Sequence, residues 1–139
     1  MAVERTLALV KPDAVAAGNT GAILAMIEGA GLRIVSMRMT RLTREQAQAF
    51  YAVHRERGFY GELCQFMSSG PIVSLVLEGE DAIARWRDLM GPTDSTKAGP
   101  DTVRGRYGTS VSRNAVHGSD APSTAAVEIP FFFPTQALV

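Results

Sequence analysis

The feature of this chain that most constrains its fold is the order in which short strand patterns and helix patterns follow one another. Apolar or alternating stretches predict four strands, at residues 5–10, 32–42, 72–77 and 116–117. Amphipathic or capped stretches predict helices at residues 20–27, 43–53, 61–67, 81–90 and 123–132. With the extra helices set aside, the order is strand, helix, strand, strand, helix, strand. This order is typical of the split βαβ, ferredoxin-like plan, so we expect an α+β fold: a four-stranded antiparallel sheet with helices packed on one face.

Three local signals add detail to this plan. The strand alternation slips near Val35, which predicts a β-bulge. Thr43 and Gln46 have the spacing of a capping box, which predicts the start of a helix. Pro130 falls inside the last predicted helix and should kink or end it just after Glu128, because proline lacks the N–H that a helix interior needs.

The segment from 91 to 113 has no sustained periodicity and predicts a long loop, which in a compact domain is usually functional or disordered. Basic residues are in excess around it: Arg85, Arg87, Lys97, Arg104, Arg106 and Arg113 stand against Asp88, Asp94 and Asp101. Guanidinium groups and hydroxyls suit phosphate oxygens, so a phosphate-binding loop is expected here. Taken by itself, the segment fits a merely solvated loop about as well.

Length and composition exclude several classes of protein. The chain fits one domain, placed at residues 1–139. A formal net charge of zero argues against dedicated nucleic-acid binding and against a polybasic membrane anchor. Cys64 is the only cysteine, so no intrachain disulfide and no multi-cysteine zinc site is available. No apolar run has transmembrane length and the first residues do not read as a signal peptide, so we expect a cytoplasmic protein without membrane contact.

The strongest candidate for chemistry lies in the segment Asn114-Ala115-Val116-His117-Gly118-Ser119-Asp120. One of only two histidines of the chain stands there, in a small, polar, turn-forming setting. Imidazole is neutral near physiological pH and can then act as a nucleophile. A helix start with serine and aspartate as caps accounts for the same residues about as well when the segment is taken alone.

Two common phosphate-binding motifs, G-x-x-x-x-G-K-[ST] and G-x-G-x-x-G, are absent from the sequence. A phosphate enzyme without them needs a different device, and a nucleophilic histidine surrounded by arginines is one. Lys11 directly follows a buried strand and suits such a site, although a solvated strand end is the commoner reason for a lysine there. Phe59 stands in a flexible, polar context where a flat ligand can stack, although core packing is the commoner fate.

Several segments together resemble the nucleoside diphosphate kinase family over essentially the full length. The signature N-x-x-H-G-S-D ends at Asp120, and Glu128 follows it. The other matching segments are Glu4-Arg5-Thr6-Leu7, Lys11-Pro12-Asp13, Phe50-Tyr51, Ser69-Gly70-Pro71, Leu77-Glu78-Gly79, Met90-Gly91-Pro92-Thr93 and Thr102-Val103-Arg104-Gly105. The resemblance is specific because motif, order and spacing agree together.

The resemblance implies a ping-pong kinase of broad base specificity. His117 would take the γ-phosphate from a nucleoside triphosphate and pass it to a nucleoside diphosphate, with Glu128, supported by Ser119, orienting the imidazole. The residues implied to line the nucleotide site are Lys11, Tyr51, Phe59, Arg87, Thr93, Arg104, Val111 and Asn114. Mg²⁺ would arrive bound to the nucleotide phosphates rather than in a protein metal site. The family also implies a homo-oligomer built from dimers, either a tetramer or a hexamer.

Some positions depart from the family pattern. Gly58 stands where the family usually has proline, Asp94 where asparagine is common, and Arg106 where an acidic residue is common. Because these positions only neighbour the implied ligand residues, we expect altered affinity rather than lost activity. Ala121-Pro122 replaces the usual serine cap, which proline tolerates in a first helical turn. A catalytically silent nucleotide-binding or regulatory protein on the same scaffold is the alternative.

Overall fold

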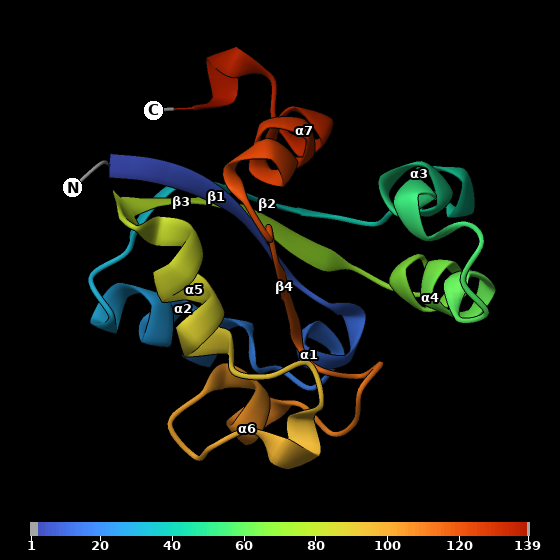
Figure 1. Cartoon of the computed structure of the whole chain (residues 1–139), viewed down its shortest axis with the longest axis horizontal. Helices are drawn as coiled ribbons and strands as arrows, with labels where there is room; N and C mark the ends of the chain where they lie inside the picture. Colours follow the sequence, from blue (N-terminus) through green and yellow to red (C-terminus); the bar gives the residue numbers. More distant parts are fainter. Residues whose placement is uncertain (1–2, 139) are drawn as a thin grey trace.

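The sheet confirms the fold that the order of elements predicts. A computed structural model of the chain describes residues 3–138. Its four strands are β1 (Val3–Val10), β2 (Arg33–Thr40), β3 (Ile72–Glu80) and β4 (Val116–Gly118). They form one antiparallel sheet in the order β2-β3-β1-β4, with β1 paired along its length to β3 (Figure 1). The short strand β4 therefore lies at an edge, beside the carboxyl end of β1.

Helices join and cover these strands. They are α1 (Pro12–Ala16), α2 (Thr20–Gly29), α3 (Arg44–Phe50), α4 (Tyr60–Met67), α5 (Ala82–Met90), α6 (Val103–Tyr107) and α7 (Pro122–Phe132), with short 3₁₀ turns at Ala52–His54, Ser95–Lys97 and Thr135–Ala137. Helix α1 was not expected from the sequence. The expectation of a loop without structure from 91 to 113 is wrong in part, because α6 and one 3₁₀ turn lie within it. Thr102 explains α6, since its hydroxyl accepts the Gly105 N–H at the helix start.

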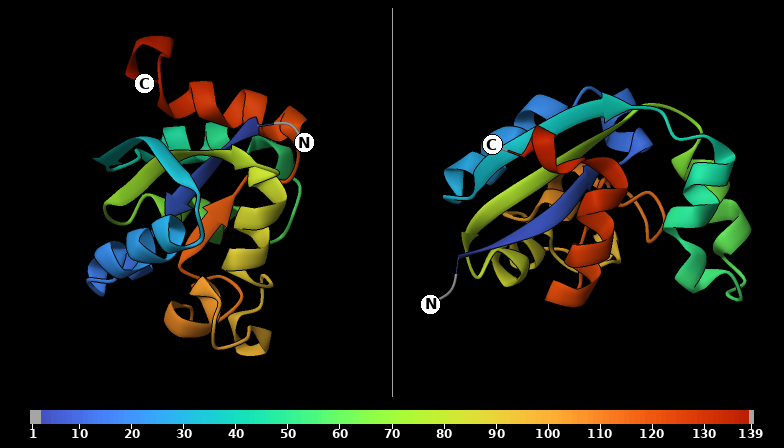
Figure 2. Two further views of the ribbon diagram at one scale, coloured as in Figure 1. Left: turned by 90° about the vertical axis from the view of Figure 1, so that its left-hand side faces the viewer. Right: turned by 90° about the horizontal axis from the view of Figure 1, so that it is seen from above.

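Helices cover both faces of the sheet, so the expectation of helices on one face is wrong. On β1, Ala8 and Val10 pack in one core with residues of α2 and α5. Leu7 and Leu9 point the other way and pack in a second core with Phe132 of α7 and with residues of α3 and α4. Figure 2 shows α7 across the sheet from α2 and α5. The reason is visible in β1, whose continuous apolar run has to be buried on both sides.

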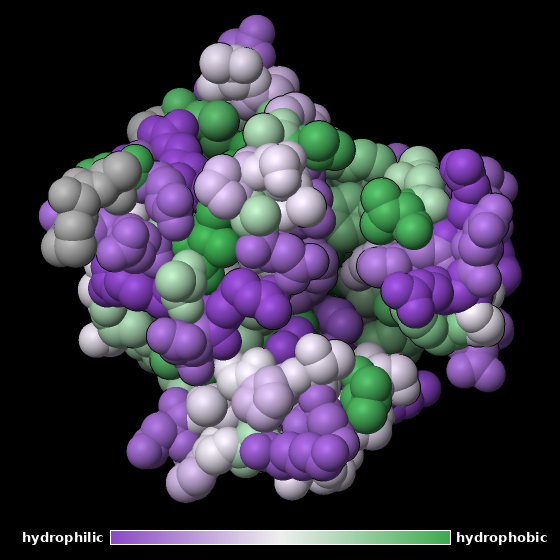
Figure 3. All heavy atoms as spheres, viewed as in Figure 1, coloured by the Kyte–Doolittle hydropathy of each residue, from purple (hydrophilic) through white to green (hydrophobic). Residues whose placement is uncertain are grey.

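The helices α3 and α4 pack on each other and project beyond the end of the sheet (Figure 1). Their buried residues, Ala47, Cys64 and Met67, join them to the second core. The loop that carries α6 lies across from them, and the surface is hollowed between the two (Figure 3). This hollow lies at the end of β1 and β4.

Two of the three local signals are confirmed. The register of β2 against β3 shifts between Ile34 and Ser36, which places the bulge at Val35. Thr43 and Gln46 form the predicted capping box, with N–H to side-chain distances of 2.9 and 3.1 Å. Pro130 was expected to kink or end the last helix, and a helix end just after Glu128 is wrong, because α7 continues through Pro130 to Phe132. Pro130 cannot donate to the carbonyl of Ala126, and both residues are exposed, so water can satisfy that carbonyl.

No helix among residues 3–138 combines the length and the apolar character that crossing a membrane requires.

Candidate active site

His117 is held rigidly at the centre of β4. Its backbone pairs with Leu9 of β1, and its carbonyl accepts the indole N–H of Trp86 at 3.2 Å. Gly118 is required beside it, because a Cβ atom there would meet the Trp86 ring at 2.6 Å. The sequence pattern His-Gly thus reflects close packing of α5 on β4, which fixes where the imidazole emerges.

The imidazole is oriented by a carboxylate from α7. Nε2 of His117 lies 3.1 Å from Oε1 of Glu128, and the Ser119 hydroxyl donates to the same oxygen at 2.8 Å. Ser119 is fixed in turn, since its Oγ accepts the Leu7 N–H at 3.3 Å. These contacts bring together three residues that the sequence assigned to one unit.

The protonation state of this pair follows from its surroundings. Burial raises the pKa of the Glu128 carboxyl, but the hydrogen bonds and charge of His117 and the bond from Ser119 outweigh it, so the pKa lies below its ordinary value. Glu128 is therefore a carboxylate at neutral pH and accepts the Nε2–H of His117. The neutral imidazole then keeps its lone pair on Nδ1, the nitrogen available to a substrate.

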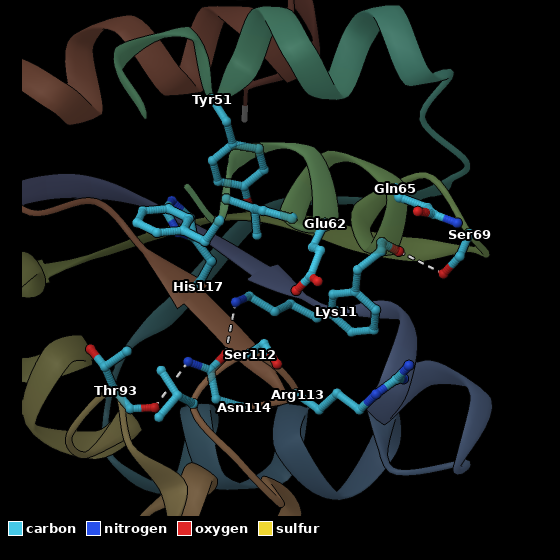
Figure 4. A pocket seen from close by; sticks show the side chains of 14 residues that line it. Lys11, Tyr51, Glu62, Gln65, Ser69, Thr93, Ser112, Arg113, Asn114 and His117 are labelled. Carbon is cyan, nitrogen blue, oxygen red and sulfur yellow. Dashed lines mark hydrogen bonds between the residues drawn. The ribbon is translucent and has the colours of Figure 1, made fainter. Parts of the chain in front are cut away.

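A pocket of about 740 Å³ opens beside His117, between the α3–α4 pair and the loop. Of the sequence-predicted residues, Lys11, Tyr51, Phe59, Thr93, Val111, Asn114 and His117 line it. Figure 4 shows Lys11 and Asn114 from opposite ends of the chain meeting within it. Phe59 is 50% exposed and Val111 is 57% exposed. Two apolar side chains left open in one pocket suit a flat ligand held by stacking.

Lys11 is a buried cation within this pocket. Its Nζ donates to Oδ1 of Asn114 at 2.7 Å. Burial and the nearby positive charge of Arg104 lower the pKa of Lys11 to about 8, against the opposing effect of Asp13. A lysine that is poorly neutralised by the protein is suited to an anionic ligand.

The backbone around Lys11 is tied to the segment before His117. The Lys11 N–H donates to the Ala115 carbonyl at 2.8 Å, and Oδ2 of Asp13 accepts the Ala115 N–H at 3.1 Å. Ala115 has φ of +71°, a left-handed conformation that is rare for a residue with a Cβ atom. The hydrogen bonds made by the N–H and the carbonyl of Ala115 hold this conformation and direct Asn114 into the pocket. The Nδ2 of Asn114 also donates to the Thr93 carbonyl at 3.1 Å.

Tyr51 forms the wall above the imidazole. Its ring packs edge-on to His117, with the ring centroids 6.3 Å apart. Burial raises the pKa of the hydroxyl, and the Glu128 charge adds to this effect, so the hydroxyl stays neutral. Among the described residues this buried hydroxyl has no hydrogen-bond partner. It is therefore free to bond with a ligand that enters the pocket.

The two arginines predicted to hold phosphates, Arg87 and Arg104, are not among the residues that line this pocket. Arg104 donates from Nη1 to the Gly91 carbonyl and from Nη2 to the Val116 carbonyl, both at 2.9 Å. Burial, followed by the charge of Arg87, lowers the pKa of Arg104 to about 10, so this guanidinium group is still charged at neutral pH. Arg87 pairs with Asp120 at 2.6 Å on the surface.

Arg113, one of the basic residues expected in the phosphate-binding loop, also lines the pocket. The further lining residues were not assigned to the site from the sequence: Glu62, Leu63, Gln65, Phe66, Ser69 and Ser112. The lining residues from α4 follow Phe59 at the three- and four-residue spacing of one side of a helix. This spacing was the one signal in the sequence that pointed to a shared face, but it did not indicate that the face lines a pocket.

Most of the positions that depart from the family pattern make local contacts, while a Cβ atom at Gly58 would meet nothing within 4 Å. Asp94 accepts the Thr96 N–H at 3.0 Å and caps a 3₁₀ turn. Arg106 donates from Nε to the Pro100 carbonyl at 2.8 Å. At the start of α7, Ala121 gives no side-chain cap, and the Thr124 hydroxyl instead accepts the N–H groups of Asp120 and Ala121 just before the helix, both at 3.0 Å. None of these contacts reaches into the pocket.

Comparison with known proteins supports the family resemblance that the sequence motifs indicate. A family model described as "Nucleoside diphosphate kinase" matches residues 4–138. A nucleoside diphosphate kinase of Bradyrhizobium diazoefficiens and one of Persephonella marina are each 55% identical over 139 residues, which is 100% of this chain and 99% of each relative. The crystal structure of the Aquifex aeolicus nucleoside diphosphate kinase is similar with a TM-score of 0.97 and 50% identity, covering 99% of this chain and 100% of that one. A halophilic nucleoside diphosphate kinase from Halobacterium salinarum, solved in complex with CDP, is similar with a TM-score of 0.95 and 40% identity. The match covers 99% of this chain and 92% of that one.

Proposed function

The chain belongs to the nucleoside diphosphate kinase family, and on that premise we propose that His117 is the residue that carries the phosphoryl group between two nucleotides. As a nucleoside diphosphate kinase, the protein transfers the terminal phosphate of a triphosphate to a diphosphate. The observation that carries the proposal is the contact of Nε2 with Glu128, which leaves Nδ1 with its lone pair at the pocket. A silent nucleotide-binding role would not need this arrangement.

The proposed reaction has two balanced halves. In the first, the lone pair of Nδ1 forms a bond to the γ-phosphorus, and the bond from that phosphorus to the bridging oxygen breaks, leaving a nucleoside diphosphate. In the second, a terminal oxygen of the acceptor diphosphate attacks the phosphorus, and the N–P bond breaks. The imidazole gains positive charge as the N–P bond forms in the first half and loses it as that bond breaks in the second, and the Glu128 carboxylate stabilises the charge across the ring in both.

The other residues of the site are assigned to bind the phosphates and the ribose of the nucleotide. Phosphoryl transfer passes through a loose transition state with its charge spread over the phosphoryl oxygens, so fixed cations matter more than covalent help. We assign Lys11 and Asn114 to the ribose hydroxyls and terminal phosphates, with the free hydroxyl of Tyr51 as a further donor. Arg87 and Arg104 are the cations that we assign to the phosphates, because the charge of Arg104 interacts with that of Lys11 in the pocket and with that of Arg87.

The pocket also fits Mg²⁺ that is bound to the nucleotide. Its polar groups beside His117 are an ammonium, an amide and a hydroxyl, from Lys11, Asn114 and Tyr51. No group of three or more His, Cys, Asp or Glu side chains that could hold a metal ion occurs in residues 3–138. Mg²⁺ prefers oxygen ligands and keeps several waters, so the phosphates would hold it and it would neutralise their charge.

A labelling experiment tests the proposal directly. The protein is incubated with γ-labelled ATP and no acceptor, and the label that stays on the protein is followed. A phosphoramidate at histidine is labile in acid and stable in base, and it should be discharged by GDP. Protein that binds nucleotide but never acquires such a label would instead support the silent alternative.

The pKa of Lys11 predicts how nucleotide binding depends on pH. Because this pKa is lowered to about 8, Lys11 is charged below that pH and becomes neutral above it. A neutral lysine cannot attract phosphate, so kcat/KM for the diphosphate should fall as the pH rises through about 8, the free-enzyme value. Lys11→Arg, at whatever rate it retains, should lack this step because arginine stays charged. A profile that stays flat in the wild-type protein as the pH rises from neutrality through this pKa would contradict the role of Lys11.

We also predict that all four bases are accepted. Phe59 and Val111 offer faces rather than hydrogen-bonding groups, and stacking of roughly 1–3 kcal/mol per base tolerates every base. The kcat/KM values for ADP, GDP, CDP and UDP with one common donor should differ by factors equivalent to no more than about 1–2 kcal/mol. Purines should be favoured because their stacking area is larger. Phe59→Ala should weaken all four by a similar factor. A single diphosphate preferred by more than about 1000-fold, roughly 4 kcal/mol, would show that strong edge-reading was missed.

The assembly and the cellular location are proposals from the family resemblance. A homo-oligomer built from dimers suits the edge strand β2, where Met37 and Met39 are exposed, at 57% and 60%. Mass measurement in solution distinguishes a tetramer from a hexamer. The cytoplasm, where nucleoside diphosphates would meet the enzyme, is the proposed compartment.

A further inference from the structure

The pocket has a polar wall beyond its stacking residues. Glu62 and Gln65 of α4, with Ser69 just after the helix, lie across from Ser112 on the loop. Figure 4 shows the Glu62 side chain pointing from α4 into the pocket, with Gln65 and Ser69 further along. Within residues 3–138, no hydrogen bond or ion pair holds the side chains of Glu62 and Gln65. Glu62 is thus an unpaired carboxylate that faces the ligand space.

The position of Glu62 along α4 decides which part of a ligand it can meet. It follows Phe59 by three residues, so both side chains project from the same side of the helix start. A base stacked on the exposed Phe59 ring presents its face to that ring. A carboxylate one turn further along the same side of α4 would then lie at the edge of the base rather than at its face.

We propose that Glu62 reads the base edge and gives the kinase a preference for guanine. This inference rests on the proposed function, because it requires a nucleotide base between Phe59 and Val111. An ionised carboxylate only accepts hydrogen bonds, through two oxygens. Guanine is the base with two adjacent donors on its Watson–Crick edge, the N1–H and the N2 amino group, and these match a carboxylate bidentately.

The other bases match a carboxylate less well. Adenine and cytosine each place one amino donor beside a ring nitrogen that is an acceptor, and uracil places one N–H between two carbonyl oxygens. An acceptor facing a carboxylate is repelled rather than bound. Glu62 is exposed, so water competes for its bonds and the preference is modest. It stays within the narrow range of base selectivity predicted above.

Inosine diphosphate isolates this contact, because it differs from GDP only in lacking the N2 amino group. We expect kcat/KM for GDP to exceed that for IDP by about 3- to 10-fold in the wild-type protein. Glu62→Ala should bring this ratio close to one. Glu62→Gln, which keeps one acceptor oxygen but loses the bidentate pair, should give an intermediate ratio.

A structural role of Glu62 predicts a different result in this experiment. Glu62 lies in the first turn of α4, where an acid stabilises a helix, but a loss of helix stability would not change the ratio between two purines. A general effect of its negative charge is tested by Glu56→Ala, the matched control. This substitution removes the same charge from the exposed turn before α4 and should leave the ratio unchanged. Calorimetric binding of GDP and IDP to both variants should show the same pattern.

Two results overturn the inference: a wild-type ratio of one, or a ratio that persists in Glu62→Ala. Failure of the proposed function would look different, because no diphosphate would then discharge a phosphorylated protein. Turnover of all diphosphates with equal use of GDP and IDP rejects only the role of Glu62.

Discussion

His117→Gln is expected to abolish covalent labelling and to reduce turnover by roughly 10⁴-fold or more, the range seen when a nucleophile is removed. Glutamine can donate to Glu128 but its amide has no nucleophilic lone pair. The fold should survive, because the side chains of His117 and Glu128 are both partly exposed and the Glu128 carboxylate keeps a donor. The measurement is transfer from γ-labelled ATP to the protein, with the melting temperature as a check on folding.

The chain offers a matched control for this experiment, since His54 is the only other histidine. His54 lies in a 3₁₀ turn and packs between the rings of Tyr51 and Phe59. His54→Gln should retain the label, which should remain labile in acid and dischargeable by GDP. Label that persists in His117→Gln and disappears in His54→Gln would reverse the assignment.

Glu128→Gln is expected to slow phosphotransfer by roughly 10- to 1000-fold without weakening nucleotide binding, as for the loss of one positioning and charge-stabilising contact. The amide still bonds to Nε2, but it no longer compensates the positive charge that develops on the imidazole of His117. It can also present its NH₂ group to the ring, which favours the wrong tautomer and places the proton on Nδ1.

Separate measurement of binding and turnover distinguishes this role from a structural one. The dissociation constant for ADP should stay the same, while kcat falls. The rate of phosphohistidine formation in a single turnover should fall with kcat, because the chemical step is the one affected. If Glu128→Gln turns over at the wild-type rate, the 3.1 Å contact with His117 does not contribute to catalysis.

Much of the fold could be predicted from the sequence, because many of its signals act over a few residues. The side chains of Thr43 and Gln46 each accept the other's backbone N–H at the start of α3. The bulge at Val35 follows from a break in the alternation of apolar and polar residues along the strand. The order of strands and helices predicted the split βαβ plan, in which β1 pairs with β3 and β4 rather than with β2, its neighbour in sequence. The signature around His117 identified the family and its reaction without any coordinates.

Only the tertiary structure decided how the site is built. The bond from Lys11 to Asn114 joins residues 103 positions apart, and that from the Leu7 N–H to Ser119 joins residues 112 apart. Both depend on the register of β1 against β4, which no local pattern in either segment encodes. For the same reason the sequence did not show that α7 would pack on the second face of the sheet, or that Glu62 would face the pocket. A side chain's partners are set by which elements pack together, whereas local propensity sets only which elements form.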